Sequence, residues 1–256
     1  MKQTKSSKGR NGRKEQVLQV SVFSLALILT LILLLNVGIT NADPAGASIT
    51  SNITSTAPSY SPGNRSDNGG TINTLTFNVV QQDANWKAYV GNISGTLTLD
   101  DSNGKSIYQW AMTNADITGE IYATKIDNPD WSIINCSNQT TTDAEDTALG
   151  FSNTSVDSIN RTFNETTHQS IFVAGRTIAA NTCKATSTYV NNTAQNQSSA
   201  DFQQILFSSG TDVVYVSPIN QGKTSYDGNS TVDFQMLIAD DITAAITPYY
   251  FFVEIG

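Results

Sequence analysis

Histidine and cysteine are nearly absent: the 256 residues include 1 His and 2 Cys. A zinc site or a hydrolytic triad would require more than the lone His168, which lies in a polar loop. The chain also lacks a Gly-x-Ser-x-Gly elbow and a Cys-x-x-Cys pair. We therefore predict that the protein is not an enzyme, that it holds no cofactor, and that His168 is a solvated loop residue.

Basic residues are scarce as well, and they are placed unevenly. The chain has 14 Lys and Arg against 22 Asp and Glu, a net charge of −8. Much of the basic charge precedes the first apolar run, at Lys2, Lys5, Lys8, Arg10, Arg13 and Lys14. The remainder is acidic, which argues against nucleic acid as a partner because phosphate binding needs clustered Lys and Arg.

Charged residues are missing altogether between Gln16 and Ala42, a stretch that contains the apolar run 20–35. We predict a basic cytoplasmic flank at 1–16 and a membrane segment at 17–40, with the C-terminal part translocated to the outside. Such a length suits a retained anchor. Small residues at 40–42 and 45–47 also suit signal peptidase, so the protein is anchored in the cell membrane or, if cleaved, secreted.

Large apolar residues are then rare in the Ser/Thr/Asn/Gly/Pro-rich stretch 41–70, which predicts a flexible stalk. From 71 to 256 short alternating runs predict an all-β ectodomain, a β-sandwich or jelly roll. The predicted strands lie at 75–79, 97–99, 107–112, 117–124, 171–174, 202–207, 213–216, 232–238 and 249–255. The Asn103-Gly104 step predicts a hairpin turn, and a short helix is predicted at 143–149.

The two cysteines, Cys136 and Cys183, suit one disulfide in an oxidising compartment, although two buried free thiols are the alternative. Eleven Asn-x-Ser/Thr sequons predict N-glycosylation, while the same residues also serve in turns. The acceptors are Asn52, Asn64, Asn92, Asn135, Asn138, Asn153, Asn160, Asn164, Asn191, Asn196 and Asn229.

Acidic turns are the one candidate for a metal site, because calcium takes oxygen ligands from loops. They lie at 100–103, 127–130, 143–146 and 240–241, and none has the pattern of a calcium-binding loop. Carboxylate pairs also serve glycoside hydrolysis, but that requires a separation in space that no spacing along the chain reveals. Trp110 alternates with Tyr108 and Met112, which favours core packing over a sugar-binding platform.

The stretch from Trp86 to Asp101, the Tyr108-x-Trp110 motif and the 119–124 run resemble uncharacterised archaeal-type exported cell-surface proteins. The likeness continues through Cys136, the 179–183 segment and the aromatic end at 249–253, so that it covers about 71–256. It implies an exported surface domain and transfers no catalytic residue.

These features together favour a membrane-tethered, N-glycosylated surface protein that contributes to the cell envelope or to adhesion. An alternative is a fibre subunit in which a strand of one copy completes the sheet of the next by β-augmentation. A secreted glycosidase or peptidase is a third hypothesis, supported only by scattered carboxylates. The sequence does not identify the surface partner.

Overall fold

The computed structural model describes residues 43–58, 61, 63–113, 116–241 and 247–255. The predicted cytoplasmic flank at 1–16 and membrane segment at 17–40 lie outside these residues. None of the helices in the described ranges combines the length and the apolar character needed to cross a bilayer.

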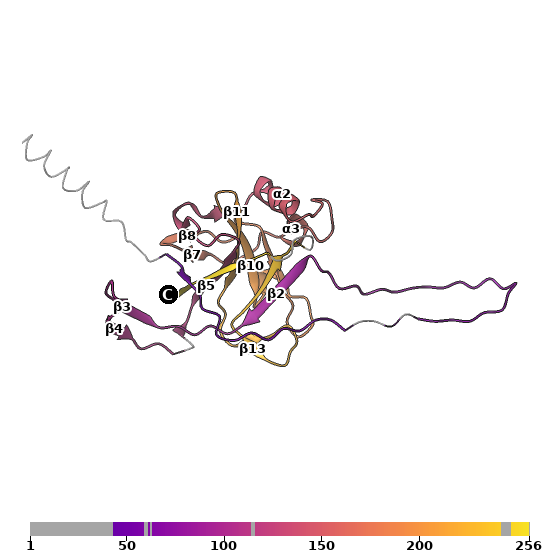
Figure 1. Ribbon diagram of the computed structural model, residues 1–256, viewed down its shortest axis with the longest axis horizontal. Helices are drawn as coiled ribbons and strands as arrows, with labels where there is room; N and C mark the ends of the chain where they lie inside the picture. Colours follow the sequence, from indigo (N-terminus) through magenta and orange to yellow (C-terminus); the bar gives the residue numbers. More distant parts are fainter. Residues whose placement is uncertain (1–42, 59–60, 62, 114–115, 242–246, 256) are drawn as a thin grey trace, which may run out of the picture. The chain divides into compact units, whose positions relative to one another are not determined.

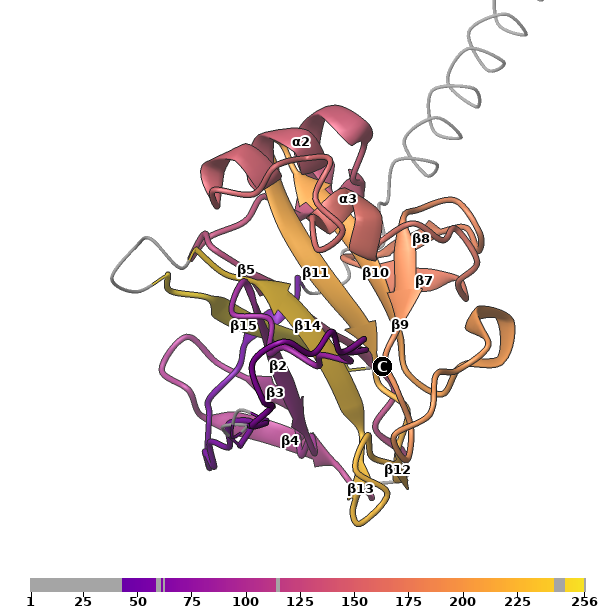
Figure 2. The same cartoon turned by 90° about the vertical axis from the view of Figure 1, so that its right-hand side faces the viewer.

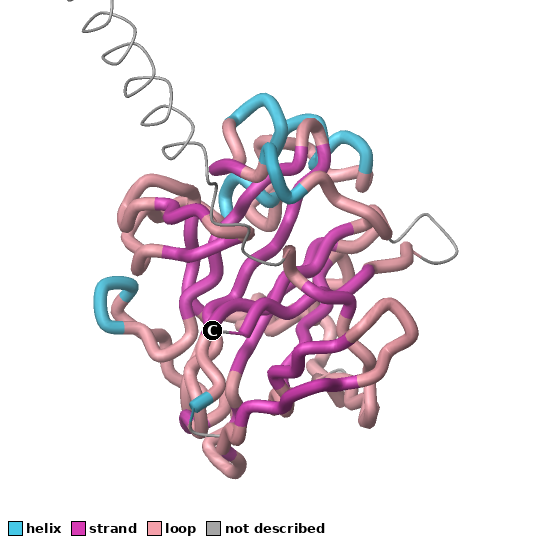
Figure 3. Tube along the Cα trace, turned by 90° about the vertical axis from the view of Figure 1, so that its left-hand side faces the viewer, coloured by secondary structure: helices cyan, strands magenta, loops and turns pink. Residues whose placement is uncertain are grey.

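The described chain is mostly β, with short helices at the periphery of the strands (Figure 3). Its strands are β1 (Ala45–Gly46), β2 (Trp86–Gly91), β3 (Leu97–Asp100), β4 (Ser106–Trp110), β5 (Gly119–Thr124), β6 (Asn135–Cys136), β7 (Ile171–Val173), β8 (Arg176–Ile178), β9 (Ala185–Ser187), β10 (Gln203–Ser209), β11 (Asp212–Pro218), β12 (Lys223–Thr224), β13 (Thr231–Val232), β14 (Phe234–Ala239) and β15 (Tyr250–Ile255). The helices are α2 (Gln139–Ala148) and α3 (Ile159–Thr162), with 3-10 turns η2 (Trp131–Ile133) and η3 (Gln197–Ser199).

A seven-stranded antiparallel sheet organises the domain, in the order β1-β15-β5-β11-β10-β6 with β9 also paired to β10 (Figure 1). β15, the last strand of the chain, lies between β1 and β5. The first residue of β5, Gly119, lies very close to the backbone of β15. Its φ is +119°, and a Cβ on it would lie 2.0 Å from Glu254 O. Only glycine fits there.

Both faces of this sheet are buried, because its central strands carry apolar side chains at odd and even positions alike. One face packs with β14 and with residues around α2 and α3 (Figure 2). This first cluster includes Ile121, Ala123, Leu149, Ile159, Phe163, Leu206, Val213, Tyr215, Phe234, Met236 and Ile238. The second face packs with β7, β9 and the 131–134 turn, in a cluster with Tyr122, Trp131, Ile134, Ile171, Val173, Ile205, Phe207, Val214, Val216 and Phe252.

Two buried polar side chains connect the β14–β2 pair to the large sheet. The side-chain amide of Gln204 donates to Leu237 O at 2.6 Å and accepts from Leu237 N at 2.8 Å. These are the two bonds that the backbone of a neighbouring strand would make. Ser217 Oγ donates to Gln235 O at 2.9 Å. These bonds satisfy backbone groups of β14 that would otherwise be buried without partners.

Most of the predicted strands are confirmed, with ends that shift by no more than two residues. The predicted hairpin forms between β3 and β4, and Gly104 has the positive φ of 71° that its turn needs. The predicted short helix is confirmed as the longer α2. β2 was not among the predicted strands, and the strand predicted at 75–79 is wrong because these residues are exposed and unpaired.

The stalk prediction for 41–70 is wrong at its start. Ala45 pairs with Val253 and Gly46 with Phe252, and Ala47 N donates to Phe251 O at 2.8 Å. The sheet therefore begins at β1, and the described residues of 48–84, here called the insert, contain no helix or strand. The insert lies between two strands of the domain instead of preceding it.

Candidate functional site

The sequon asparagines lie at the surface. Ten of the eleven are exposed, and Asn160 is half-buried. Five of them lie within or near α2 and α3 in the sequence, the two helices labelled in Figure 2. They are Asn135, Asn138, Asn153, Asn160 and Asn164. None of the eleven falls between residues 93 and 134, the part that carries the β3–β4 hairpin.

Several of these asparagines also have local structural roles, which they perform with the side-chain oxygen. Asn138 Oδ1 accepts from Thr141 N at 3.0 Å and caps α2, and Asn196 Oδ1 accepts from Ser198 N at 3.1 Å in η3. Asn160 Oδ1 accepts from Lys184 Nζ at 2.6 Å. An N-linked sugar attaches to the amide nitrogen and leaves this oxygen as an acceptor, so the turn role and glycosylation are compatible at one residue.

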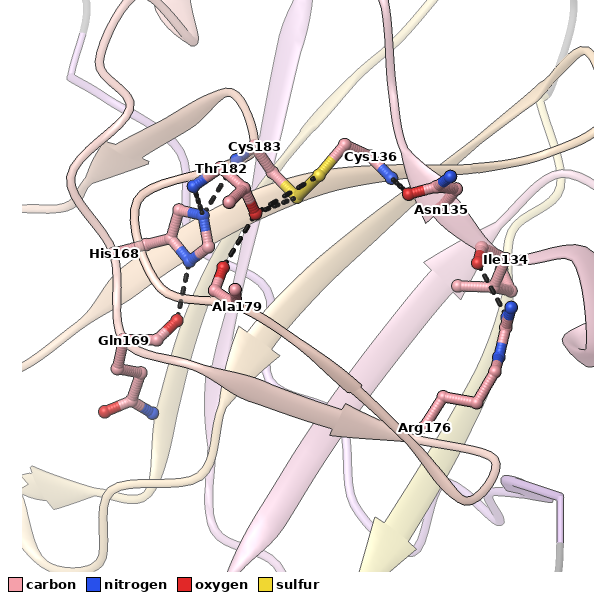
Figure 4. Close-up of a disulfide and its surroundings, with 9 residues drawn as sticks. All are labelled: Ile134, Asn135, Cys136, His168, Gln169, Arg176, Ala179, Thr182 and Cys183. Atoms are coloured by element: carbon pink, nitrogen blue, oxygen red, sulfur yellow. Dashed lines mark hydrogen bonds between the residues drawn. A yellow bond between two sulfur atoms is a disulfide. The ribbon is translucent and has the colours of Figure 1, made fainter.

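The predicted disulfide is present between Cys136 and Cys183, with a Cα–Cα distance of 4.9 Å (Figure 4). It joins β6, at one edge of the seven-stranded sheet, to the turn before β9. Thr182 lies against the bridge, with Oγ1 3.6 Å from Cys136 Sγ and 3.7 Å from Cys183 Sγ. Arg176 donates to the carbonyls of Trp131 and Ile134 and so fixes the preceding turn.

His168 is buried, with 3 % of its surface exposed, so the predicted solvated position is wrong. Its Nε2 accepts from Thr182 N at 3.0 Å and from Cys183 N at 2.9 Å, while Nδ1 lies 2.6 Å from Gln169 O (Figure 4). Two amide donors at Nε2 require the neutral ring with its proton on Nδ1. Burial lowers the pKa of His168, and the Gln169 carbonyl acts in the opposite direction.

Two carboxylates face each other across β5 and β15, where Glu120 is paired with Glu254. Phe172 N donates to Glu120 at 3.3 Å, and Ala174 N donates to Glu254 at 3.1 Å, so the β7–β8 hairpin covers both groups. The pKa of Glu120 is raised to about 7, mainly by burial, against the Phe172 N–H bond that lowers it and with a smaller contribution from the charge of Glu254. The pKa of Glu254 is also raised, by burial.

A second buried acidic group lies under α2. Lys125 Nζ donates to Glu145 at 2.7 Å, and Asp146 accepts from Ile159 N at 2.7 Å at the start of α3. Burial raises the pKa of both carboxyls. Glu145 therefore connects α2 to the residue that follows β5, and Asp146 connects α2 to α3.

The acidic turns considered for calcium are occupied by local bonds. Asp101 Oδ1 accepts from Asn103 N and Lys105 N, both at 2.8 Å, and these bonds lower its pKa. Asp130 caps η2 through Ser132 N, and Asp240 pairs with Lys87 at 2.9 Å. Among the residues that the structure describes, no three His, Cys, Asp or Glu side chains gather in a way that could hold a metal ion.

Exposed apolar side chains are concentrated in two segments, both N-terminal to β5. The apolar segment 71–80 of the insert presents Ile72, Leu75, Phe77, Val79 and Val80 to solvent. The second place is the β3–β4 hairpin, whose register places four exposed apolar side chains in two facing pairs, Leu97 with Trp110 and Leu99 with Tyr108. The predicted core position of Trp110 and Tyr108 is therefore wrong, and they pack mainly on each other, with ring centroids 5.1 Å apart.

The sequence pattern placed His168 in a solvated loop and did not single out Glu120 or Glu254. The β5 run carried a weak signal, because its Gly-Glu-Ile-Tyr-Ala-Thr pattern places a charge in an otherwise apolar strand. No family model, no curated protein and no solved structure matches this chain.

Proposed function

We propose that this chain is a non-catalytic, N-glycosylated protein that acts outside a cell membrane, in the cell envelope or in contact with surfaces and other cells. Residues 17–40 tether it to the membrane, or a peptidase releases it there. We further propose that its ectodomain is a β-sandwich, in which the β14–β2 pair packs on the seven-stranded sheet.

The observation that carries the proposal is the state of the sequon asparagines. A chance excess of Asn, Ser and Thr would place some acceptors in the core, yet ten of eleven are exposed and the last is half-buried. Those with a capping role use the amide oxygen, which leaves the nitrogen for a sugar. A disulfide adds support, because structural disulfides belong to oxidising compartments.

Site-specific mass spectrometry of the protein from its native membranes tests the proposal. We expect glycopeptides at several sequons, among them the one at Asn138. Thr140→Ala should remove the sugar at Asn138 without changing helix stability, because Thr140 is exposed and Asn138 keeps its capping bond. Asn138→Ala should remove the sugar and also destabilise α2 by about 1 kcal/mol. Unmodified asparagine at all eleven positions would overturn the proposal.

The fibre subunit is a second candidate, favoured by the unpaired apolar segment 71–80. The outer edge of β15 is not open to an added strand, because it is already paired with β1 of the same chain. A fibre would therefore need a different acceptor edge.

A further inference from the structure

The β3–β4 hairpin is an incomplete sheet. Its two strands pair only with each other among the described residues, and one face carries Leu97, Leu99, Tyr108 and Trp110. An isolated two-stranded hairpin is marginally stable in water, and three strands or a covering layer are normally needed. The hairpin therefore lacks a partner for its apolar face and for its outer edges.

The apolar segment 71–80 has the pattern of a strand but lacks a sheet to pair with. Its residues Leu75, Phe77 and Val79 alternate with Thr74, Thr76 and Asn78, the pattern of a half-buried strand. The structure leaves it without a strand partner, and Phe77 is 79 % exposed. Within one copy of the chain, segment and hairpin do not cover each other, because both remain exposed.

We propose that the apolar segment of one copy adds as a third strand to the edge of β4 in a second copy. Residues 75–79 match β4 in length, and Leu75, Phe77 and Val79 would extend the apolar face that Tyr108 and Trp110 begin. Main-chain bonds to the free edge would supply affinity, and the alternating side chains would supply register.

Charge favours β4 as the edge at which two copies meet. Copies of a chain with a net charge of −8 repel each other, so a contact between them is opposed least where both surfaces carry no charge. Residues 68–82 contain no charged side chain, and neither do residues 106–113, whereas β3 ends at Asp100 and is followed by Asp101. The hairpin also lies in the stretch without sequons, where no sugar would block the approach.

Photocrosslinking between isotope-labelled copies tests this contact directly. Full-length chains with natural nitrogen and with ¹⁵N, each carrying benzoylphenylalanine in place of Phe77, are mixed in mild detergent and irradiated. We expect crosslinked peptides that join the insert of one label to residues 106–113 of the other. Same-label pairs alone would mean pairing within one chain and would overturn the proposal. The control places the photoprobe at Ile53, which is 93 % exposed in the same insert.

Matched substitutions test the contact in the same chains by sedimentation. Phe77→Thr and Tyr108→Thr should each weaken self-association by about tenfold. Ile53→Thr and Ile107→Thr should leave it unchanged, since Ile107 lies on the opposite face of β4. Equal effects of test and control variants, or a chain that stays monomeric, would refute the contact. Either result would leave the glycosylation proposal intact, because that proposal is read from sugar occupancy.

Discussion

β11 and β4 are both short antiparallel strands with several apolar side chains, but they differ in what covers them. In β11, Val213 and Tyr215 face one cluster while Val214 and Val216 face the other, so both sides are buried. In β4, Tyr108 and Trp110 alternate with polar or opposite-facing residues and share one face, yet both remain exposed. The difference teaches that alternation predicts a strand, while burial depends on a second layer that other parts of the chain must provide.

The sharpest way to break this contrast is to remove β15 from the covered sheet. Deleting 250–255 should unfold the domain in the full-length chain, because β15 separates β1 from β5 and contributes to both clusters. Phe252→Ala alone should cost about 3–5 kcal/mol in urea denaturation. Tyr250→Ala, at an exposed position of the same strand, should cost far less. A deletion that melts normally but no longer self-associates would make β15 an intermolecular strand.

Reduction of the disulfide should have the next largest effect. The bridge between Cys136 and Cys183 closes a long loop, so its loss should lower the free energy of unfolding by about 3–4 kcal/mol. Urea denaturation with and without reductant measures this. The double variant Cys136→Ala/Cys183→Ala should already show the loss and should not respond to reductant.

Replacing Glu120 should stabilise the covered sheet at neutral pH. The folded pKa of about 7 lies above the ordinary 4.5, so the folded state binds more protons between these values. Stability should be fully present below about pH 4.5 and should fall by up to roughly 3 kcal/mol as the pH rises through 7. Glu120→Gln should remove much of this slope and raise the melting temperature at pH 8. The exposed Glu165→Gln is the control, and an equal response in both variants would contradict the assignment.

His168 should give a smaller dependence in the opposite direction. Because its pKa is lowered in the folded state, the unfolded chain binds more protons below about pH 6.5, and stability should fall as the pH drops through that range. His168→Phe should abolish this part of the slope. It should also destabilise at all pH values by about 1–3 kcal/mol, because the Thr182 and Cys183 amides lose their acceptor.

The smallest effects are expected in the uncovered region. Phe77→Ala and Ile107→Ala should change the stability of the dilute, monomeric chain by no more than about 0.5 kcal/mol, since neither side chain is buried. Thermal melting at low protein concentration measures this. A loss comparable with that of Phe252→Ala would show that the apolar segment or the hairpin packs against the domain.

The patterns that could be read from the sequence were those with local causes. The apolar runs of β10, β11 and β14 identify strands, and the Asn-Gly step identifies the β3–β4 turn. β2 escaped prediction because Lys87 lies on its inner side, where it pairs with Asp240 and stacks on Tyr249 at 5.0 Å. Asp240 and Tyr249 both come from segments more than a hundred residues away, so no local pattern contains them.

The amino-acid sequence by itself determined the β class, the two cysteines available for a disulfide and the positions of the sequon asparagines, because each depends on residue type or on a short local pattern. Only the tertiary structure decided that Ala45 and Gly46 join the last strand, that His168 is buried beside the disulfide and that Trp110 is exposed. These outcomes depend on which distant segments meet. A side chain is buried only when another layer covers it, and the alternation of a single strand carries no information about that layer.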